Sequence, residues 1–71
     1  MSYDARERTE RLARVYALAE HVLGEGELAR AFLAVPHAEL DGESPLDVLA
    51  TEVGARQVEE ILWAAYFGLP A

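Results

Sequence analysis

The sequence predicts an all-α fold, a helical bundle of four to five short helices in one small domain. Apolar residues recur every three to four positions near both ends of the chain, as they do on one face of a helix. No stretch alternates between apolar and polar residues as a strand does. A chain of 71 residues is below the size at which a single core is comfortably stable, so a partner or a homo-oligomer is expected.

The first predicted helix begins at Ser2 or Asp4, either of which can cap it, and ends at Gly24. At about 100° per residue, its apolar residues fall on one side. They are Ala5, Leu12, Val15, Tyr16, Ala19, Val22 and Leu23. A second, shorter helix is expected from residue 27 to residue 33, and its inward-facing residues are predicted to be Leu28, Ala31 and Phe32.

Residues 32–51 contain many residues that end or start helices. We call the key ones the elbow: Pro36, Asp41, Gly42, Ser44, Pro45 and Thr51. Pro36 lacks a backbone N–H and restricts the residue before it, so the preceding helix is expected to stop near Ala34. Asp41-Gly42 is a strong turn dipeptide, which predicts a sharp turn before the next helix.

Two helix starts follow that turn. Ser44 is placed to cap a short helix that begins at Pro45, and Leu40 is expected to pack back on that helix. Thr51 is a second N-cap, because an acidic residue follows it where the helix dipole favours negative charge. The last helix then runs to Gly68, and one of its faces carries Val58, Ile61, Leu62 and Ala65.

Composition limits the cellular setting. The longest unbroken apolar run, residues 61–67, is far shorter than the roughly 20 residues that span a bilayer. The N-terminus has no apolar segment typical of a secretory signal. The chain has no cysteine, so disulfides and thiolate metal sites are excluded. We therefore expect a cytoplasmic protein that does not enter a membrane.

The charge is unevenly distributed. The formal net charge is −7, and lysine is absent. Up to residue 19 the chain is slightly basic, with four arginines against three acids, whereas residues 20–60 carry ten acids against two arginines. Such a surface repels a phosphate backbone, so direct nucleic-acid binding is not expected. It either keeps a small protein in solution or attracts a basic partner.

The last helix carries an anomaly. Trp63 and Phe67 lie one turn apart and away from the apolar face, on the side that holds Arg56, Glu59 and Glu60. Two interpretations are open: the first helix covers these aromatic side chains, or they form a partner-binding patch. Tyr66 lies between the two faces and could serve either.

The sequence offers no catalytic constellation. Glu59 and Glu60 are adjacent on a helix and cannot converge on one substrate atom. One serine lies at the terminus and the other caps a helix. His21 and His37 lie in different elements without a metal-ligand pattern; His37 is expected to bond the loop backbone and His21 to complement a helix C-terminus. We expect neither an enzyme nor a metal or cofactor site.

The order of these residues resembles the toxin-binding domain of the Xre/MbcA/ParS antitoxins. The family pattern is a Trp-Leu or Phe-Leu pair, a proline, a Leu-x-Gly turn, Pro-x-x-Leu-Leu, Thr-x-x-Gly, then Val, Leu and a closing Gly. The resemblance spans about residues 10 to 71, and the residues that carry it are Phe32, Leu33, Pro36, Leu40, Asp41, Gly42, Ser44, Pro45, Leu46, Leu49, Thr51, Gly54, Val58, Leu62 and Gly68.

This resemblance implies a bacterial type II antitoxin that neutralises a cognate toxin, usually a RES-domain enzyme that consumes NAD⁺ or a related ADP-ribosyltransferase. In that family the C-terminal end commonly reaches toward the catalytic cleft of the toxin. Carried over by position, the partner-binding residues are Trp63, Tyr66 and Phe67 as anchors and Gly68, Leu69, Pro70 and Ala71 as a blocking tail.

The chain departs from the family pattern in two ways. Most members carry a helix-turn-helix DNA-binding domain before this one, whereas residues 1–71 are expected to be a single toxin-binding domain. Ala64 stands where the family often has an arginine, and Phe32 replaces the commoner tryptophan.

Two alternative functions stay open. One is a transcriptional co-regulator or dimerisation module, whose early arginines touch DNA or which needs a DNA-binding partner chain. The other, less favoured by the residue inventory, is a small enzyme.

Overall fold

The structure is a computed structural model that describes residues 3–68. Its elements in that range are α1 (Tyr3–Leu23), α2 (Glu27–Ala34), the short 3₁₀ helix η1 (Ala38–Leu40), α3 (Pro45–Val48) and α4 (Glu52–Phe67). The described part of the chain contains no strand, so the all-α prediction is confirmed. None of these helices combines the length and the apolar character needed to cross a bilayer.

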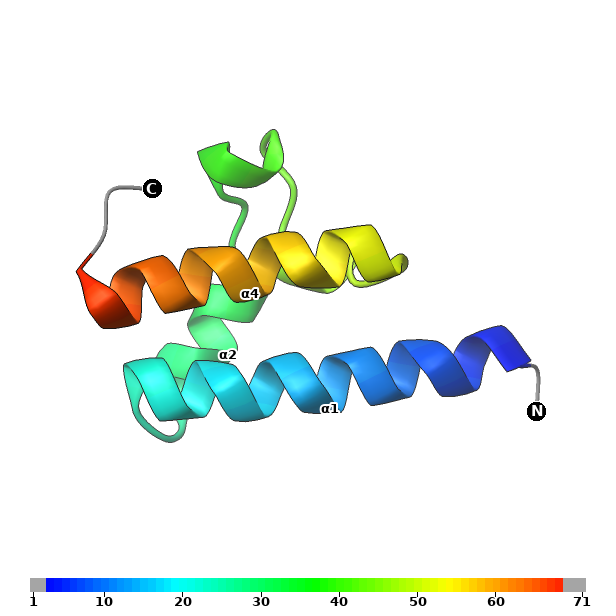
Figure 1. The fold of residues 1–71 in the computed structure, drawn as a ribbon, viewed down its shortest axis with the longest axis horizontal. Helices are drawn as coiled ribbons and strands as arrows, with labels where there is room; N and C mark the ends of the chain where they lie inside the picture. Colours follow the sequence, from blue (N-terminus) through cyan, green and yellow to red (C-terminus); the bar gives the residue numbers. More distant parts are fainter. Residues whose placement is uncertain (1–2, 69–71) are drawn as a thin grey trace.

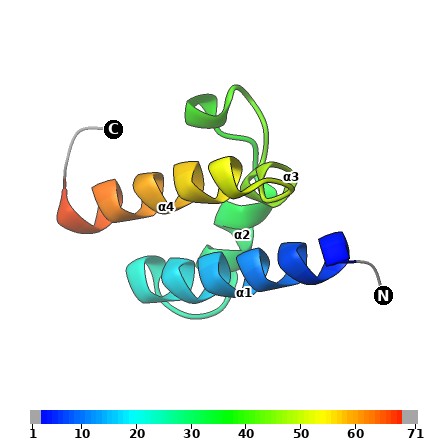
Figure 2. The same cartoon turned by 45° about the vertical axis from the view of Figure 1, so that its right-hand side comes forward.

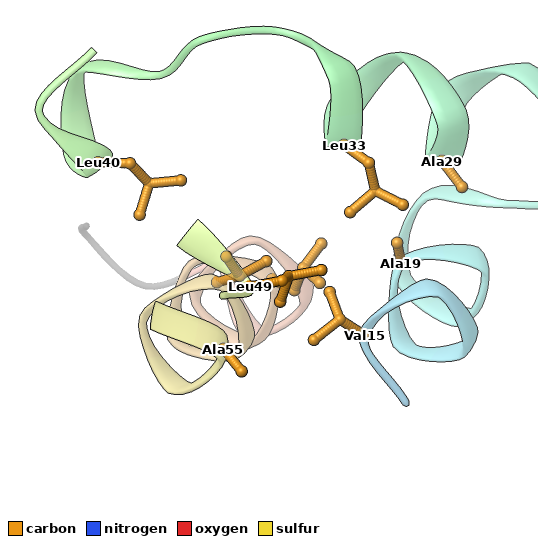
Figure 3. Close-up of a cluster of buried hydrophobic side chains, with 9 residues drawn as sticks. Val15, Ala19, Ala29, Leu33, Leu40, Leu49 and Ala55 are labelled. Carbon is orange, nitrogen blue, oxygen red and sulfur yellow. The ribbon is translucent and has the colours of Figure 1, made fainter. Parts of the chain in front are cut away.

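The two long helices, α1 and α4, lie side by side and run in the same direction (Figure 1, Figure 2). Helix α2 packs against α1, and the short α3 contacts both α2 and α4. Side chains of α1, α2, η1 and α4, together with Leu49 directly after α3, fill the core (Figure 3). The fully buried apolar residues are Val15, Ala19, Ala29, Leu33, Leu40, Leu49, Ala55, Val58 and Leu62.

Glycine and proline end the helices where the sequence predicts. Helix α1 stops one residue before Gly24, and α2 stops at Ala34, after which Val35 is extended as expected before a proline. Gly68 caps α4 in the left-handed conformation, with φ 69°, and its N–H donates to the carbonyl of Ala65 at 3.3 Å. These helix boundaries are confirmed.

The turn in the elbow forms at Asp41 and Gly42, which both have positive φ, 57° and 82°. Backbone bonds close it: the His37 N–H donates to the Glu43 carbonyl at 3.1 Å, and the Gly42 N–H donates to the His37 carbonyl at 2.9 Å. Leu40, just before the turn, is buried in the core, against which Val48 of α3 also packs.

Both predicted N-caps are confirmed. The Ser44 hydroxyl accepts the Asp47 N–H at 3.3 Å, with Pro45 as the first residue of α3. The Thr51 hydroxyl accepts the Gly54 N–H at 3.0 Å at the start of α4. The elbow therefore sets where α3 and α4 begin.

The inward face predicted for the second helix is wrong. Helix α2 buries Ala29 and Leu33, whereas Leu28 is 66% exposed, Ala31 is exposed and Phe32 is half-buried. The reason is that α2 packs against both α1 and α3. This packing buries Ala29 and Leu33, which lie one turn apart, instead of the side that carries Leu28 and Phe32.

Most residues on the predicted apolar faces of the two long helices are buried or half-buried, but some are exposed. Val58 and Leu62 are buried and Ile61 is half-buried, whereas Ala65 is exposed. On α1 the exceptions are Ala5 and Leu12, which are both exposed.

Arg11 is buried, 8% exposed, on the core side of α1, which the sequence analysis did not anticipate. Its Nε donates to the carbonyl of Leu49 at 2.7 Å, and its Nη2 donates to the carbonyl of Ala50 at 2.9 Å. Glu7 lies 3.8 Å from its Nη1. Because the last carbonyls of a helix lack partners within the helix, Arg11 supplies the donors that the end of α3 needs.

We expect Arg11→Met to lower the free energy of unfolding by about 2–3 kcal/mol, because it keeps the aliphatic stem but removes the donors to both carbonyls. Urea unfolding followed by circular dichroism measures this change. Arg8→Met is the matched control: Arg8 is an exposed residue of the same helix, and its loss should cost no more than about 0.5 kcal/mol. Equal effects of the two substitutions would contradict the proposed role of Arg11.

Gly54 lies inside α4 where that helix meets the end of α3. A Cβ at this position would overlap the backbone carbonyl of Val48, so no side chain fits without moving one helix relative to the other. The close approach explains why a residue that weakens helices stands in this one.

Gly54→Ala should therefore lower the free energy of unfolding by about 1–3 kcal/mol, even though alanine favours helices, because the overlap exceeds that gain. Thermal and urea unfolding test it. Gln57→Ala, on the exposed side of the same helix, should leave stability within about 0.5 kcal/mol. A stabilised Gly54→Ala variant would show that α3 and α4 are not in close contact here.

Candidate partner-binding site

Four ring side chains gather where α1 and α4 end. We call Trp63, Tyr66, Phe67 and His21 the aromatic cluster. The Tyr66 ring stacks on His21 at a centroid distance of 5.3 Å, and Trp63 stacks on Phe67 at 5.7 Å. Edge-to-face contacts at 5.0–5.6 Å join Tyr66 to Phe67 and to Trp63. The rings therefore hold one another in a fixed arrangement.

The aromatic cluster remains in contact with solvent. Trp63 is 40% exposed, Tyr66 50% and Phe67 63%. The interpretation in which the first helix covers Trp63 and Phe67 is therefore wrong. The ring contact that α1 makes with the cluster comes from His21. Large aromatic side chains that share one exposed patch are typical of protein-binding surfaces.

His21 is the member of the cluster that sequence reasoning missed. It lies in the last turn of α1, as expected for a residue that complements a helix C-terminus, but its ring also packs on Tyr66 and Trp63. His21 is 42 or more residues away from Trp63 and Tyr66 in the sequence, so no local pattern predicts that the rings meet. The parallel packing of α1 and α4 brings them together.

The other predicted partner-binding residues follow the cluster directly. Gly68 ends α4 with positive φ, so the chain leaves the helix axis immediately after Phe67. Leu69, Pro70 and Ala71, predicted as the blocking tail, lie outside the described residues.

A charged, shallow groove adjoins Trp63 along α4. Arg14 of α1 joins two acids of α4, with its Nη2 3.0 Å from Glu52 and its Nε 3.3 Å from Glu59. Arg56 pairs with the same Glu52 at 3.6 Å. These groups are partly exposed, so the ion pairs that connect the two helices here add little stability. The groove is lined by Arg14, Glu52, Arg56, Glu59, Glu60 and Trp63.

The two histidines have structural contacts. The His37 Nε2 lies 2.9 Å from the carbonyl oxygen of Phe32, and its ring packs on the Phe32 ring at 4.7 Å. His37 therefore bonds the backbone of the last turn of α2, whereas a bond to the loop backbone was expected. Among the described residues, no group of three or more His, Cys, Asp or Glu side chains is placed to hold a metal ion.

A small helical domain with an exposed aromatic cluster defines the chain as a candidate binding domain. Its residues 18–68 match the antitoxin Xre/MbcA/ParS C-terminal toxin-binding domain. This match covers most of the chain and includes the elbow and the aromatic cluster. The chain belongs to that family.

A curated relative agrees with this assignment. The chain is 37% identical over 62 residues to the protein named antitoxin Xre from Pseudomonas putida, and the aligned part is 87% of this chain and 39% of that relative. The chain thus spans well under half the length of the relative. The comparison with solved structures gives no significant match.

Proposed function

We propose that this chain binds a cognate toxin and inhibits it, as the toxin-binding part of a type II antitoxin in the bacterial cytoplasm. The observation that carries the proposal is the aromatic cluster, which stands exposed at the end of α4 in a chain that belongs to a family of toxin-binding domains. No step of the proposal requires catalysis by the chain itself.

The proposed toxin is an NAD-consuming RES-type enzyme or an ADP-ribosyltransferase-like one. The acidic surface supports this choice, since a cleft that binds a pyrophosphate is basic and attracts carboxylates. In the proposed mechanism Trp63, Tyr66 and Phe67 dock on the rim of the cleft, and residues 68–71, which follow the docked rings directly, enter it.

The alternative, a transcriptional co-regulator whose early arginines touch DNA, has less support. Arg11 is buried against backbone carbonyls, and Arg14 is bound to two glutamates of α4. Of the four early arginines, these two are therefore engaged within the chain.

The first experiment is co-expression of this chain with its adjacent open reading frame, with growth, intracellular NAD⁺ and co-purification as readouts. We expect the neighbour alone to stop growth and deplete NAD⁺, and this chain to restore both while it co-elutes with the neighbour. A harmless neighbour that does not co-purify would overturn the proposal. Growth arrest without loss of NAD⁺, rescued by this chain, would retain the antitoxin and reject the proposed toxin chemistry.

Trp63→Ser and Phe67→Ser should each weaken toxin binding by roughly thirtyfold or more, as loss of an aromatic anchor does in other interfaces. Isothermal titration calorimetry with the purified toxin measures the change. Leu28→Ser is the matched control, because Leu28 is as exposed as Phe67 but lies on α2, away from the cluster. If all three variants bind alike, the cluster is not the docking surface.

Removal of residues 69–71 should abolish inhibition and leave binding through the cluster measurable, since Gly68 and α4 remain intact. The readouts are NAD⁺ consumption by the purified toxin and the dissociation constant of the complex. Full inhibition by the shortened chain would show that the tail does not block the cleft, without bearing on docking by the cluster.

A further inference from the structure

The charged groove along α4 carries an excess of negative charge, because two arginines and three glutamates line it. Arg14 pairs with Glu52 and with Glu59, and Arg56 pairs with Glu52. Glu60 is exposed and forms no ion pair with any residue of the described part of the chain. The carboxylate of Glu60 is therefore the charge of this groove that no arginine compensates.

The indole ring of Trp63 forms one wall of the same groove. Phe67, one turn later in α4, stacks on this ring at a centroid distance of 5.7 Å, and Tyr66 meets it edge-to-face at 5.6 Å. These rings leave Trp63 40% exposed. The π system of an indole attracts a cation placed over it, so a basic side chain that enters the groove finds a second attractive surface there.

Glu60 and Trp63 lie three residues apart on α4, which makes them neighbours on the surface of that helix. A single cation can therefore contact both side chains. A guanidinium suits this pair better than an ammonium does, because its planar fork pairs with a carboxylate through two N–H groups while its face stacks on an aromatic ring.

We propose that the charged groove receives an arginine of the toxin, whose guanidinium pairs with Glu60 and lies against Trp63. This inference rests on the proposed function and adds the chemistry of one contact to it. Charge complementarity favours a basic occupant: the chain has a net charge of −7, the groove is acidic, and the proposed toxin cleft is basic. A partner without a cation at this place would leave the carboxylate unpaired in the complex, so the contact also provides specificity.

Neutralisation of Glu60 tests the contact. Glu60→Gln keeps the size of the side chain and should raise the dissociation constant of the toxin complex by roughly tenfold, mainly through faster dissociation. Surface plasmon resonance with the purified product of the adjacent open reading frame measures both rates. Glu39→Gln is the matched control, since it makes the same change in net charge at an exposed residue of η1. It should change the dissociation constant by no more than about twofold.

A double-mutant cycle tests whether one cation contacts both side chains. Trp63→Leu removes the π system, so Glu60→Gln should cost roughly threefold or less in that background instead of tenfold. Independent contacts predict the same tenfold loss in both backgrounds, and that result would overturn the shared arginine. Far-UV circular dichroism of each variant checks that α4 is intact.

Arg56→Gln distinguishes a basic occupant from an acidic one. Loss of this positive charge should tighten binding of an arginine, whereas weaker binding would assign the groove to a carboxylate and overturn the proposal. A loss of binding in Trp63→Ser and Phe67→Ser without any effect of Glu60→Gln would retain the aromatic cluster as the docking surface and reject the arginine contact. If the product of the neighbouring frame does not bind the wild-type chain, the proposed function and this inference are both overturned.

Discussion

The guanidinium of Arg11 joins segments that are far apart in the sequence. It connects α1 to the carbonyls of Leu49 and Ala50, at the point where α3 ends and α4 is about to begin. A charged donor buried among apolar neighbours must find such acceptors, because an unpaired one costs several kcal/mol. The bonds from Arg11 therefore place the start of α4 beside this residue of α1. The positions of the later residues of α4 along α1 follow from that starting point.

The start of α4 is fixed from the other side by the elbow. The Thr51 cap sets the first residue of α4, and Gly54 lets the helix pass directly against the carbonyl of Val48. From there α4 runs beside α1 for its whole length (Figure 1), so the ends of both helices meet and His21 reaches Tyr66. The aromatic cluster is thus placed by contacts that lie at the opposite end of α4.

The chain presents two different surfaces as a result. Ring contacts within α4 and between α4 and His21 of α1 join the members of the aromatic cluster. The outward face of α1 carries an apolar groove whose lining includes Leu12, Ala13 and Tyr16.

The sequence by itself determined the local features: the helix ends at Gly24, Ala34 and Gly68, the caps at Ser44 and Thr51, and the aromatic residues at one end of α4. These depend on backbone conformation and on neighbours within a few residues. The tertiary structure decided which faces are buried. In α2 the buried residues are Ala29 and Leu33, and in α1 Arg11 is buried. Trp63 and Phe67 stay exposed, and the ring of His21 contacts Trp63. Those outcomes depend on how helices distant in sequence are aligned with one another. The hydrophobic periodicity of each helix does not specify that alignment.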